Sequence, residues 1–265
     1  MKKIPFSKYQ GTGNDFILVD NRHPSYLTRR DTELIRLMCD RRFGIGADGL
    51  ILLQNHADFD FEMIYFNADG NESTMCGNGG RCIAAFAKSL GIVSDHCRFV
   101  AIDGPHEAIV QENAWVELKM SDVPDAEQGD GYFILNTGSP HYVIFVEDVS
   151  DINIVEGGQA IRYSDRFRKD GINVNFVEKS DAGLMVATYE RGVEAETLSC
   201  GTGVTAAALA WHLNRPGNGI SEVPIITKGG SLKVRYVPDG HGGFTDVWLC
   251  GPATNVFEGI YPVST

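Results

Sequence analysis

Three observations predict an α+β protein made of two similar halves. Strand-like runs far outnumber helical ones and follow one another along the chain, as is typical of α+β proteins. Cys-Gly-Asn-Gly at 76–79 returns as Cys-Gly-Thr-Gly at 200–203, each time before an alanine-rich stretch. The run at 13–19 has a similar counterpart at 138–144. A repeat of about 125 residues is far too long for a solenoid and predicts two halves related by a pseudo-two-fold axis.

Most of the strand-like runs are rich in β-branched and aromatic residues, the composition that strands favour. In chain order they are 16–19, 50–53, 59–66, 99–102, 107–111, 115–119, 142–146, 173–178, 184–189, 224–227, 232–236 and 245–250. A last run at 256–263 lies beyond the second copy of the repeat, so we expect it to return to the first half.

Helices are expected at four places, namely 31–42, 79–90, 152–161 and 204–214. In the first of them Asp31 is the expected N-cap, because Leu34, Ile35 and Met38 follow it at the spacing of one helix face. A polar stretch with a proline at 121–125 is the expected boundary between the halves. We therefore expect one domain at 1–121, completed by 255–265, and a second at 122–254.

The composition excludes several classes of function. The 265 residues carry a net charge of -12, which argues against nucleic acid or an anionic membrane as a partner. No apolar run approaches the length of a membrane span and no signal-like segment opens the sequence, so the cytoplasm is the expected compartment. The six cysteines are then expected to be thiols, and no pair has the spacing of a zinc site, so no metal is expected.

Cys76 and Cys200 are the candidate catalytic residues. Each stands immediately before an expected helix, whose first N–H groups have no partner inside the helix. These N–H groups and the helix dipole favour a thiolate, which lowers the pKa of a cysteine. The glycines that follow allow a ligand to approach the backbone closely. The sequence thus predicts two activated thiols, each beside an anion-binding helix start.

Two opposed thiols suit the inversion of a stereocentre. One thiolate removes a proton from one face of the carbon, and the other thiol delivers a proton to the opposite face. The substrate carboxylate would lie at the helix starts, where N–H groups stabilise the charge that develops. Two alternatives stay open at this point, namely that both cysteines are ordinary buried residues, or that they form a disulfide with each other.

Several polar residues could hold a substrate. Asn67 and the pair Glu190-Arg191 each follow a strand-like run and precede a cysteine turn by nine or ten residues. Asn14 and His141 lie in the other repeated turn, and Asn173 lies within a strand-like run. Each of them also has a structural interpretation, as a turn, core or edge-strand residue. The GxGxxG match at 44–49 is rejected as a dinucleotide site, because a helix-like run precedes it and a strand-like run follows.

At these residues the sequence resembles the diaminopimelate epimerase family. The resemblance covers nearly the whole chain and is carried by motifs at 11–16, 66–70, 76–82, 140–141, 173–174, 189–192 and 200–203. It implies interconversion of LL- and meso-diaminopimelate without metal or cofactor, in the synthesis of lysine and peptidoglycan precursors. It also implies a homodimer in which each half is a β-barrel-like sheet around a central helix, with the active site in the cleft between the halves.

The resemblance also assigns roles. Cys76 and Cys200 match the acid/base pair, His141 and Glu190 match groups that tune the two thiols, and Phe257 matches a dimer contact. The expected substrate contacts are Asn14, Asn67, Gly77, Asn78, Asn173, Glu190, Arg191, Gly201 and Thr202.

Two departures from the family pattern concern substrate affinity. Gly49 stands where many members carry a glutamine, and Ser139 stands where many carry an asparagine. Two alternatives to diaminopimelate epimerisation remain. A proline or hydroxyproline epimerase of the same architecture also uses two cysteines, and a non-catalytic amino-acid binding protein could share the scaffold.

Overall fold

The computed structural model describes residues 2–215 and 221–263, which fold as two compact units. Unit 1 comprises Met1–Leu118 and Pro252–Thr265, and unit 2 comprises Lys119–Gly251. Each unit is a mixed sheet with few helices, so the expected α+β class is confirmed.

Unit 1 is built from a sheet and two helices. Its strands are β1 (Lys2–Gly11), β2 (Asn14–Asp20), β3 (Gly49–Gln54), β4 (Phe61–Asn67), β5 (Glu72–Ser73), β6 (His96–Ala101), β7 (Gly104–Val110), β8 (Trp115–Lys119) and β18 (Thr254–Val263). Its helices are α1 (Thr32–Cys39) and α2 (Gly77–Ser89). The sheet runs β18-β1-β2-β3-β4-β6-β7-β8, with parallel pairing at β2–β3 and β4–β6 and antiparallel pairing elsewhere.

Unit 2 repeats this plan. Its strands are β9 (Glu127–Gln128), β10 (Tyr132–Asn136), β11 (Pro140–Val146), β12 (Asn173–Ser180), β13 (Gly183–Glu190), β14 (Ala195–Thr197), β15 (Ser221–Thr227), β16 (Gly230–Pro238) and β17 (Phe244–Pro252). Its helices are η1 (Val149–Asp151), α3 (Ile154–Arg162) and α4 (Gly201–Asn214). The parallel pairs β11–β12 and β13–β15 correspond to β2–β3 and β4–β6, so the two units share one topology.

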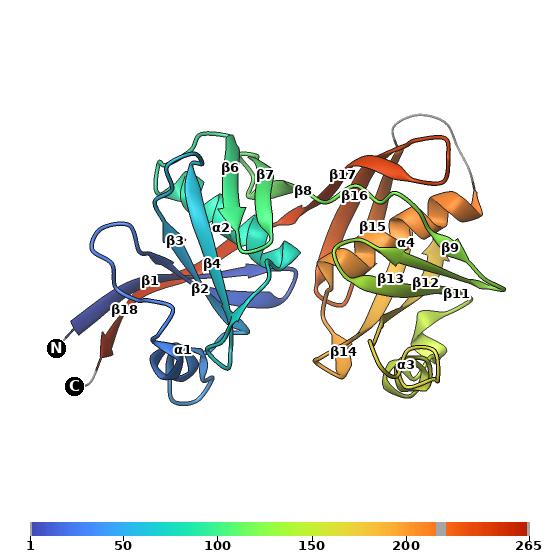
Figure 1. Cartoon of the computed structure of the whole chain (residues 1–265), viewed down its shortest axis with the longest axis horizontal. Coiled ribbons are helices and arrows are strands. Elements are labelled where there is room, and N and C mark those ends of the chain that lie inside the picture. Colours follow the sequence, from blue (N-terminus) through green and yellow to red (C-terminus); the bar gives the residue numbers. More distant parts are fainter. Residues whose placement is uncertain (1, 216–220, 264–265) are drawn as a thin grey trace. The chain divides into compact units, whose positions relative to one another are not determined.

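The sheet of each unit curves around a central helix, α2 in unit 1 and α4 in unit 2 (Figure 1). Most of the residues of α2 and α4 are buried, and the small side chains of Ala206, Ala207 and Ala208 let the strands close around α4. A helix that is apolar on all sides is stable only when it is enclosed in this way. The beginning of each central helix is therefore held by the core of its own unit.

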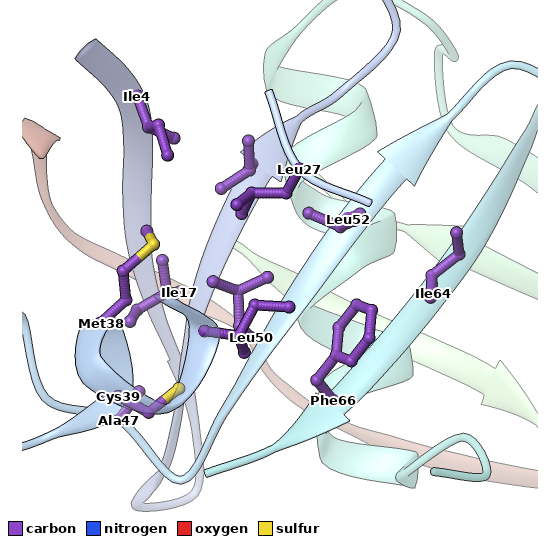
Figure 2. Close-up of a cluster of buried hydrophobic side chains, with 12 residues drawn as sticks. Ile4, Ile17, Leu27, Met38, Cys39, Ala47, Leu50, Leu52, Ile64 and Phe66 are labelled. Carbon is purple, nitrogen blue, oxygen red and sulfur yellow. The ribbon is translucent and has the colours of Figure 1, made fainter. Parts of the chain in front are cut away.

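The opposite face of each sheet is covered by a second helix. In unit 1, Ile35 and Met38 of α1 pack with Ile17, Leu50 and other strand residues in an apolar cluster (Figure 2). In unit 2, Ile154 of α3 belongs to the corresponding cluster. Burial of each such side chain contributes about 1.5–3 kcal/mol.

The structure differs from the sequence-based expectations at several elements. The strands β1 and β10 and the short strands β5, β9 and β14 were not predicted. The helices α2 and α4 begin at the glycine directly after each cysteine, two or three residues earlier than expected. Asp31 does occupy the N-cap position of α1, but its carboxylate accepts hydrogen bonds from the N–H and hydroxyl of Thr28 at 2.7 and 2.8 Å instead of capping the helix. Among the described residues, none of the helices is long and apolar enough to span a bilayer.

Candidate active site

Cys76 is the N-cap residue of α2. Its backbone is extended (φ -93°, ψ 131°), its carbonyl accepts the hydrogen bond from Gly80 N at 2.7 Å, and its side chain is not used to cap the helix. The half-buried Cys76 side chain therefore directly precedes the first turn of α2, to which Gly77 and Asn78 belong.

The Asn14 side chain lies against Cys76 in an orientation that the structure fixes. Asn14 Nδ2 donates to Asp48 Oδ2 at 2.6 Å, and a carboxylate can only accept, so the nitrogen must face Asp48. The Asn14 carbonyl oxygen then accepts from Asn78 Nδ2 at 3.3 Å and from Cys76 Sγ at 3.5 Å. Arg81, which is fully buried, donates to Asn78 Oδ1 at 3.0 Å and so orients the Asn78 amide.

An ion-pair cluster stands behind Asn14. Lys8 Nζ lies 2.8 Å from Asp15 Oδ2, and Arg41 Nη2 lies 2.7 Å from both Asp15 Oδ1 and Asp48 Oδ1. Burial alone would raise the pKa of Asp15, but hydrogen bonds from Arg41 and Lys8 outweigh it and hold that pKa well below its usual range. The Asp48 carboxylate that anchors Asn14 is therefore itself held by Arg41, which also binds Asp15.

Cys200 begins α4 in the same way. It is the extended N-cap residue (φ -114°, ψ 113°), its carbonyl accepts from Val204 N at 2.9 Å, and its side chain does not cap the helix. The Cys200 sulfur lies 3.5 Å from Thr202 Oγ1. Thr202 is itself held at its carbonyl by Thr137 Oγ1, which donates at 2.8 Å.

His141 connects to this second turn. Its Nε2 lies 2.8 Å from Thr202 Oγ1, and its Nδ1 lies 3.0 Å from Asn175 Nδ2. The ring is fully buried, and this burial lowers the pKa of His141 to about 3, with the charge of Arg191 acting in the same direction. His141 is thus neutral at any pH at which the protein is expected to work.

Asn173 lies two residues before Asn175 at the start of β12 and organises the neighbouring turn. Its Nδ2 donates to Ser139 Oγ at 2.9 Å and to Pro140 O at 3.0 Å, and its Oδ1 accepts from Arg191 N at 2.9 Å. Arg191 is exposed and Glu190 is half-buried at the end of β13, so both stand where a ligand could reach them.

Of the remaining predicted site residues, Asn67 is exposed at the end of β4, and Gly77 and Gly201 open α2 and α4. Unit 1 therefore brings together Asn14, Asn78 and Cys76. Unit 2 brings together His141, Thr202 and Cys200, with Asn173 and Arg191 bonded to each other nearby. Phe257 belongs to neither group and lies on β18, where its ring packs edge-on against Phe6 at 5.9 Å.

The structure accounts for the departure at Gly49. A Cβ there would lie 2.5 Å from the Phe66 carbonyl oxygen and 2.5 Å from Cε2 of Tyr65, whose ring packs edge-on against Phe16. The space that a side chain would need at this position is therefore filled by Tyr65 and by the backbone of β4.

We expect Gly49→Gln to destabilise the protein by about 1–3 kcal/mol, as overpacking does, rather than to improve substrate binding. Gly49→Ala should destabilise as well, because the Cβ itself collides. Urea unfolding of the two variants measures both effects. An unchanged midpoint for Gly49→Gln, together with a lower KM, would contradict this expectation.

The other cysteines have a different environment. All six cysteines are thiols; Cys39, Cys82, Cys97 and Cys250 are buried, as is Cys200, and Cys76 is half-buried. Burial raises the pKa of Cys39, Cys82 and Cys97 to about 12, so these thiols remain protonated. Within the described part of the chain, no three His, Cys, Asp or Glu side chains are grouped so as to hold a metal ion.

Sequence reasoning missed Asn175 and Asp48. Asn175 carried a signal, because it is two residues from Asn173 and so shares its face of β12. Asp48 carried none, since only the fold brings it to Asn14.

Comparison with known proteins adds the family. The model of the diaminopimelate epimerase family matches residues 6–124 and 133–255. A diaminopimelate epimerase of Flavobacterium psychrophilum is 50% identical over 95% of this chain and 97% of its own, and one of Aquifex aeolicus is 40% identical over 97% of each. The chain belongs to the diaminopimelate epimerase family.

Solved structures with the same fold extend beyond diaminopimelate epimerases. A phenazine biosynthesis protein of the PhzF family from Bacillus anthracis has a TM-score of 0.79 at 14% identity, covering 99% of this chain and all of its own. A hydroxyproline epimerase from Agrobacterium vitis has a TM-score of 0.70 at 12% identity, covering 98% and 91%. At these identities the likeness shows the fold alone, so the hydroxyproline epimerase lends no support to the proline alternative.

Proposed function

We propose that this member of the diaminopimelate epimerase family interconverts LL- and meso-diaminopimelate with Cys76 and Cys200 as its acid/base pair, without metal or organic cofactor. One observation carries the mechanism. Equivalent helices of two units with the same topology each begin at a cysteine whose side chain is not used as a cap. A two-base inversion uses two proton-transfer groups, one for each face of the carbon, and the repeat supplies two.

The helix starts are the proposed carboxylate site. First-turn N–H groups at Gly77 and Asn78 in α2, and at Gly201 and Thr202 in α4, are donors for the carboxylate next to the reacting carbon. They would stabilise the negative charge that develops as the α-proton leaves, and one preorganised donor of this kind is worth about 3–4 kcal/mol on the barrier.

The remaining polar residues are the proposed contacts of the rest of the substrate. Arg191 can bind the distal carboxylate with two N–H groups, and Glu190 can accept from an ammonium group. Both amide hydrogens of Asn173 are engaged within the protein and its Oδ1 accepts from Arg191 N, so Asn173 would meet the substrate through the second lone pair of Oδ1. Asn67 and Asn14 complete the proposed set, and His141 and Glu190 are the proposed tuning groups.

We further propose a cytoplasmic homodimer formed through β18. Val256, Phe257 and Ile260 are 55%, 47% and 62% exposed on this strand, so β18 presents apolar side chains to solvent at the edge of the sheet of unit 1. Exposed apolar patches of this kind commonly mark protein–protein contacts.

We expect Phe257→Asp to convert the dimer to a monomer, because a charge would be buried without a partner in the interface. Size-exclusion chromatography with light scattering measures the mass directly. Ile102→Asp, which changes another exposed apolar residue away from β18, is the control. A Phe257→Asp protein that remains dimeric at micromolar concentration would refute the proposed interface.

The function is tested by proton NMR of metal-free protein with LL-diaminopimelate in deuterated water. Loss of the α-proton signal with appearance of the meso isomer is the expected result. Exchange of the α-proton of proline, with diaminopimelate untouched, would keep the two-thiol chemistry and overturn the substrate. Absence of any exchange under reducing conditions would favour the binding-protein alternative.

A further inference from the structure

The two cysteines have different hydrogen-bonding partners, although the turns around them repeat. We infer that Asn175, acting through His141 and Thr202, directs a hydroxyl hydrogen onto the Cys200 sulfur, so that Cys200 is the thiolate of the resting enzyme and Cys76 the thiol. This inference rests on the proposed function, because it assigns a state to each member of the proposed acid/base pair. It makes Asn175 a positioning residue.

The chain of hydrogen bonds starts at a backbone carbonyl. Asn175 Nδ2 donates to Tyr142 O at 3.1 Å, and Asn175 Oδ1 accepts from Thr188 Oγ1 at 2.9 Å. A carbonyl can only accept, so the amide nitrogen must face Tyr142. The second N–H of the same group therefore points at His141 Nδ1, 3.0 Å away.

This donor decides the tautomer of His141. Because Nδ1 faces an N–H group, it must present its lone pair, and the hydrogen of the neutral ring must be on Nε2. Nε2–H then donates to Thr202 Oγ1 at 2.8 Å. The Thr202 oxygen thus accepts on the His141 side, which leaves the hydroxyl hydrogen available to Cys200 Sγ, 3.5 Å away.

A hydroxyl hydrogen aimed at sulfur favours the thiolate, since a hydrogen bond to the charged form stabilises that form. At Cys76 the sulfur lies 3.5 Å from the oxygen of Asn14, which has no hydrogen to donate and is fixed in that orientation by Asp48. Asn14 accepts the hydrogen of the Cys76 thiol and would repel a thiolate. The same turn thus stabilises opposite protonation states in the two units.

The Asn175 amide is also the reason for a glycine in the second turn. A Cβ at Gly203 would lie 2.4 Å from Asn175 Oδ1, whereas a Cβ at the equivalent Gly79 would meet Ile51 Cδ1 at 3.2 Å and no polar atom. The amide is therefore packed directly on the start of α4, and unit 1 has an apolar side chain at the corresponding place.

Among the described residues, the ionisable groups on the strands of unit 2 that precede α4 include His141 on β11, Glu190 and Arg191 at the end of β13, and Glu196 on β14, which is paired with Lys228 at 2.6 Å. The nearby residues of β12, Asn173 and Asn175, carry no charge. Arg191 adds a positive charge that disfavours protonation of His141 and so preserves the neutral tautomer.

The test is the pH dependence of alkylation by iodoacetamide, with each cysteine quantified by mass spectrometry of its peptide. In the wild-type protein the midpoint for Cys200 is expected about one pH unit below that for Cys76, the size of effect that one hydrogen bond to a charged group can produce. The buried Cys39 and Cys97 are internal standards for unreactive thiols. Equal midpoints for Cys76 and Cys200 would overturn the inference.

Variants distinguish a positioning role of Asn175 and Thr202 from a packing role. Asn175→Leu and Thr202→Val should each raise the Cys200 midpoint by about one unit and leave that of Cys76 unchanged, whereas Thr202→Ser should keep the wild-type midpoint. Asn55→Leu is the matched control, because it removes an exposed asparagine that contacts His23 at 3.1 Å in unit 1. An unchanged Cys200 midpoint in both Asn175→Leu and Thr202→Val would overturn the inference.

The ring nitrogens of His141 provide an independent measurement that does not need a variant to fold. Nitrogen-15 NMR of the wild-type protein should show the neutral Nε2–H tautomer from about pH 5 to 8, a range in which an ordinary histidine titrates. The Nδ1–H tautomer would overturn the inference. If the enzyme epimerises diaminopimelate but Cys76 and Cys200 have equal alkylation midpoints, this inference is wrong and the proposed function stands. If the midpoints differ but the protein does not epimerise diaminopimelate, the proposed function is wrong and the difference between the thiols stands.

Discussion

Replacement of Cys76 or Cys200 with alanine is expected to abolish net epimerisation of diaminopimelate. Removal of one proton-transfer group costs about 10²- to 10⁴-fold in rate, and here the second group cannot substitute because it serves the other face of the carbon. Proton NMR in deuterated water distinguishes the two half-reactions. A variant that keeps one thiol can still exchange the α-proton of the hand it faces, without forming the other isomer.

The control for this experiment is Cys97→Ala. Cys97 is 1% exposed and burial raises its pKa to about 12, so its loss should change stability slightly and leave the rate near that of the wild type. Circular dichroism confirms folding of all three variants. A Cys76→Ala or Cys200→Ala protein with wild-type turnover would end the two-thiol mechanism, whatever the substrate.

The sequence was sufficient to predict the two cysteine turns because the chemistry there is local. The cysteine in this motif specifies an N-cap, the two glycines allow a ligand to approach the backbone closely, and the alanine-rich stretch specifies a buried helix. Both α2 and α4 have this form. The repeat of topology followed from the same two motifs.

Other parts of the site depend on partners distant in sequence. The strand β1 begins with Lys2 and Lys3 and contains Pro5, so its composition is a poor strand signal, and it is fixed by pairing with β18 at the opposite end of the chain. Asp48 reaches Asn14 only because β3 pairs with β2, and Gly49 is explained only by the Tyr65 ring beside it. Sequence spacing contains none of this information.

The cluster behind Asn14 leads to the second large effect, on stability. Asp15→Asn is expected to destabilise the protein by about 3 kcal/mol, because it leaves the ammonium group of Lys8 buried without its carboxylate. The Lys8 side chain is only 7% exposed and that of Asp15 18%, so water cannot replace the lost partner. Urea unfolding measures the change.

The pH dependence of the same pair has a definite sign. Since the folded-state pKa of Asp15 lies below the ordinary value of about 3.9, the stabilisation is complete well above that value and is lost as the pH falls through and below it. The difference in unfolding free energy between the wild type and Asp15→Asn should therefore be constant near neutrality and shrink in acid. A difference that grows in acid would contradict the assigned ion pair.

A double variant tests whether the loss of stability in Asp15→Asn arises from the buried Lys8 ammonium that has lost its carboxylate. Lys8→Met in the Asp15→Asn background replaces the ammonium with an apolar side chain of similar length, and should restore about half or more of the lost stability, because replacing a buried pair costs far less than breaking it. Activity need not return with stability. Asp15 Oδ1 accepts the backbone N–H of Asp48 at 3.0 Å, and Asp48 anchors Asn14 beside Cys76, so the refolded double variant should keep a reduced kcat. If stability and kcat recover together, Asp15 acts on the site through folding alone.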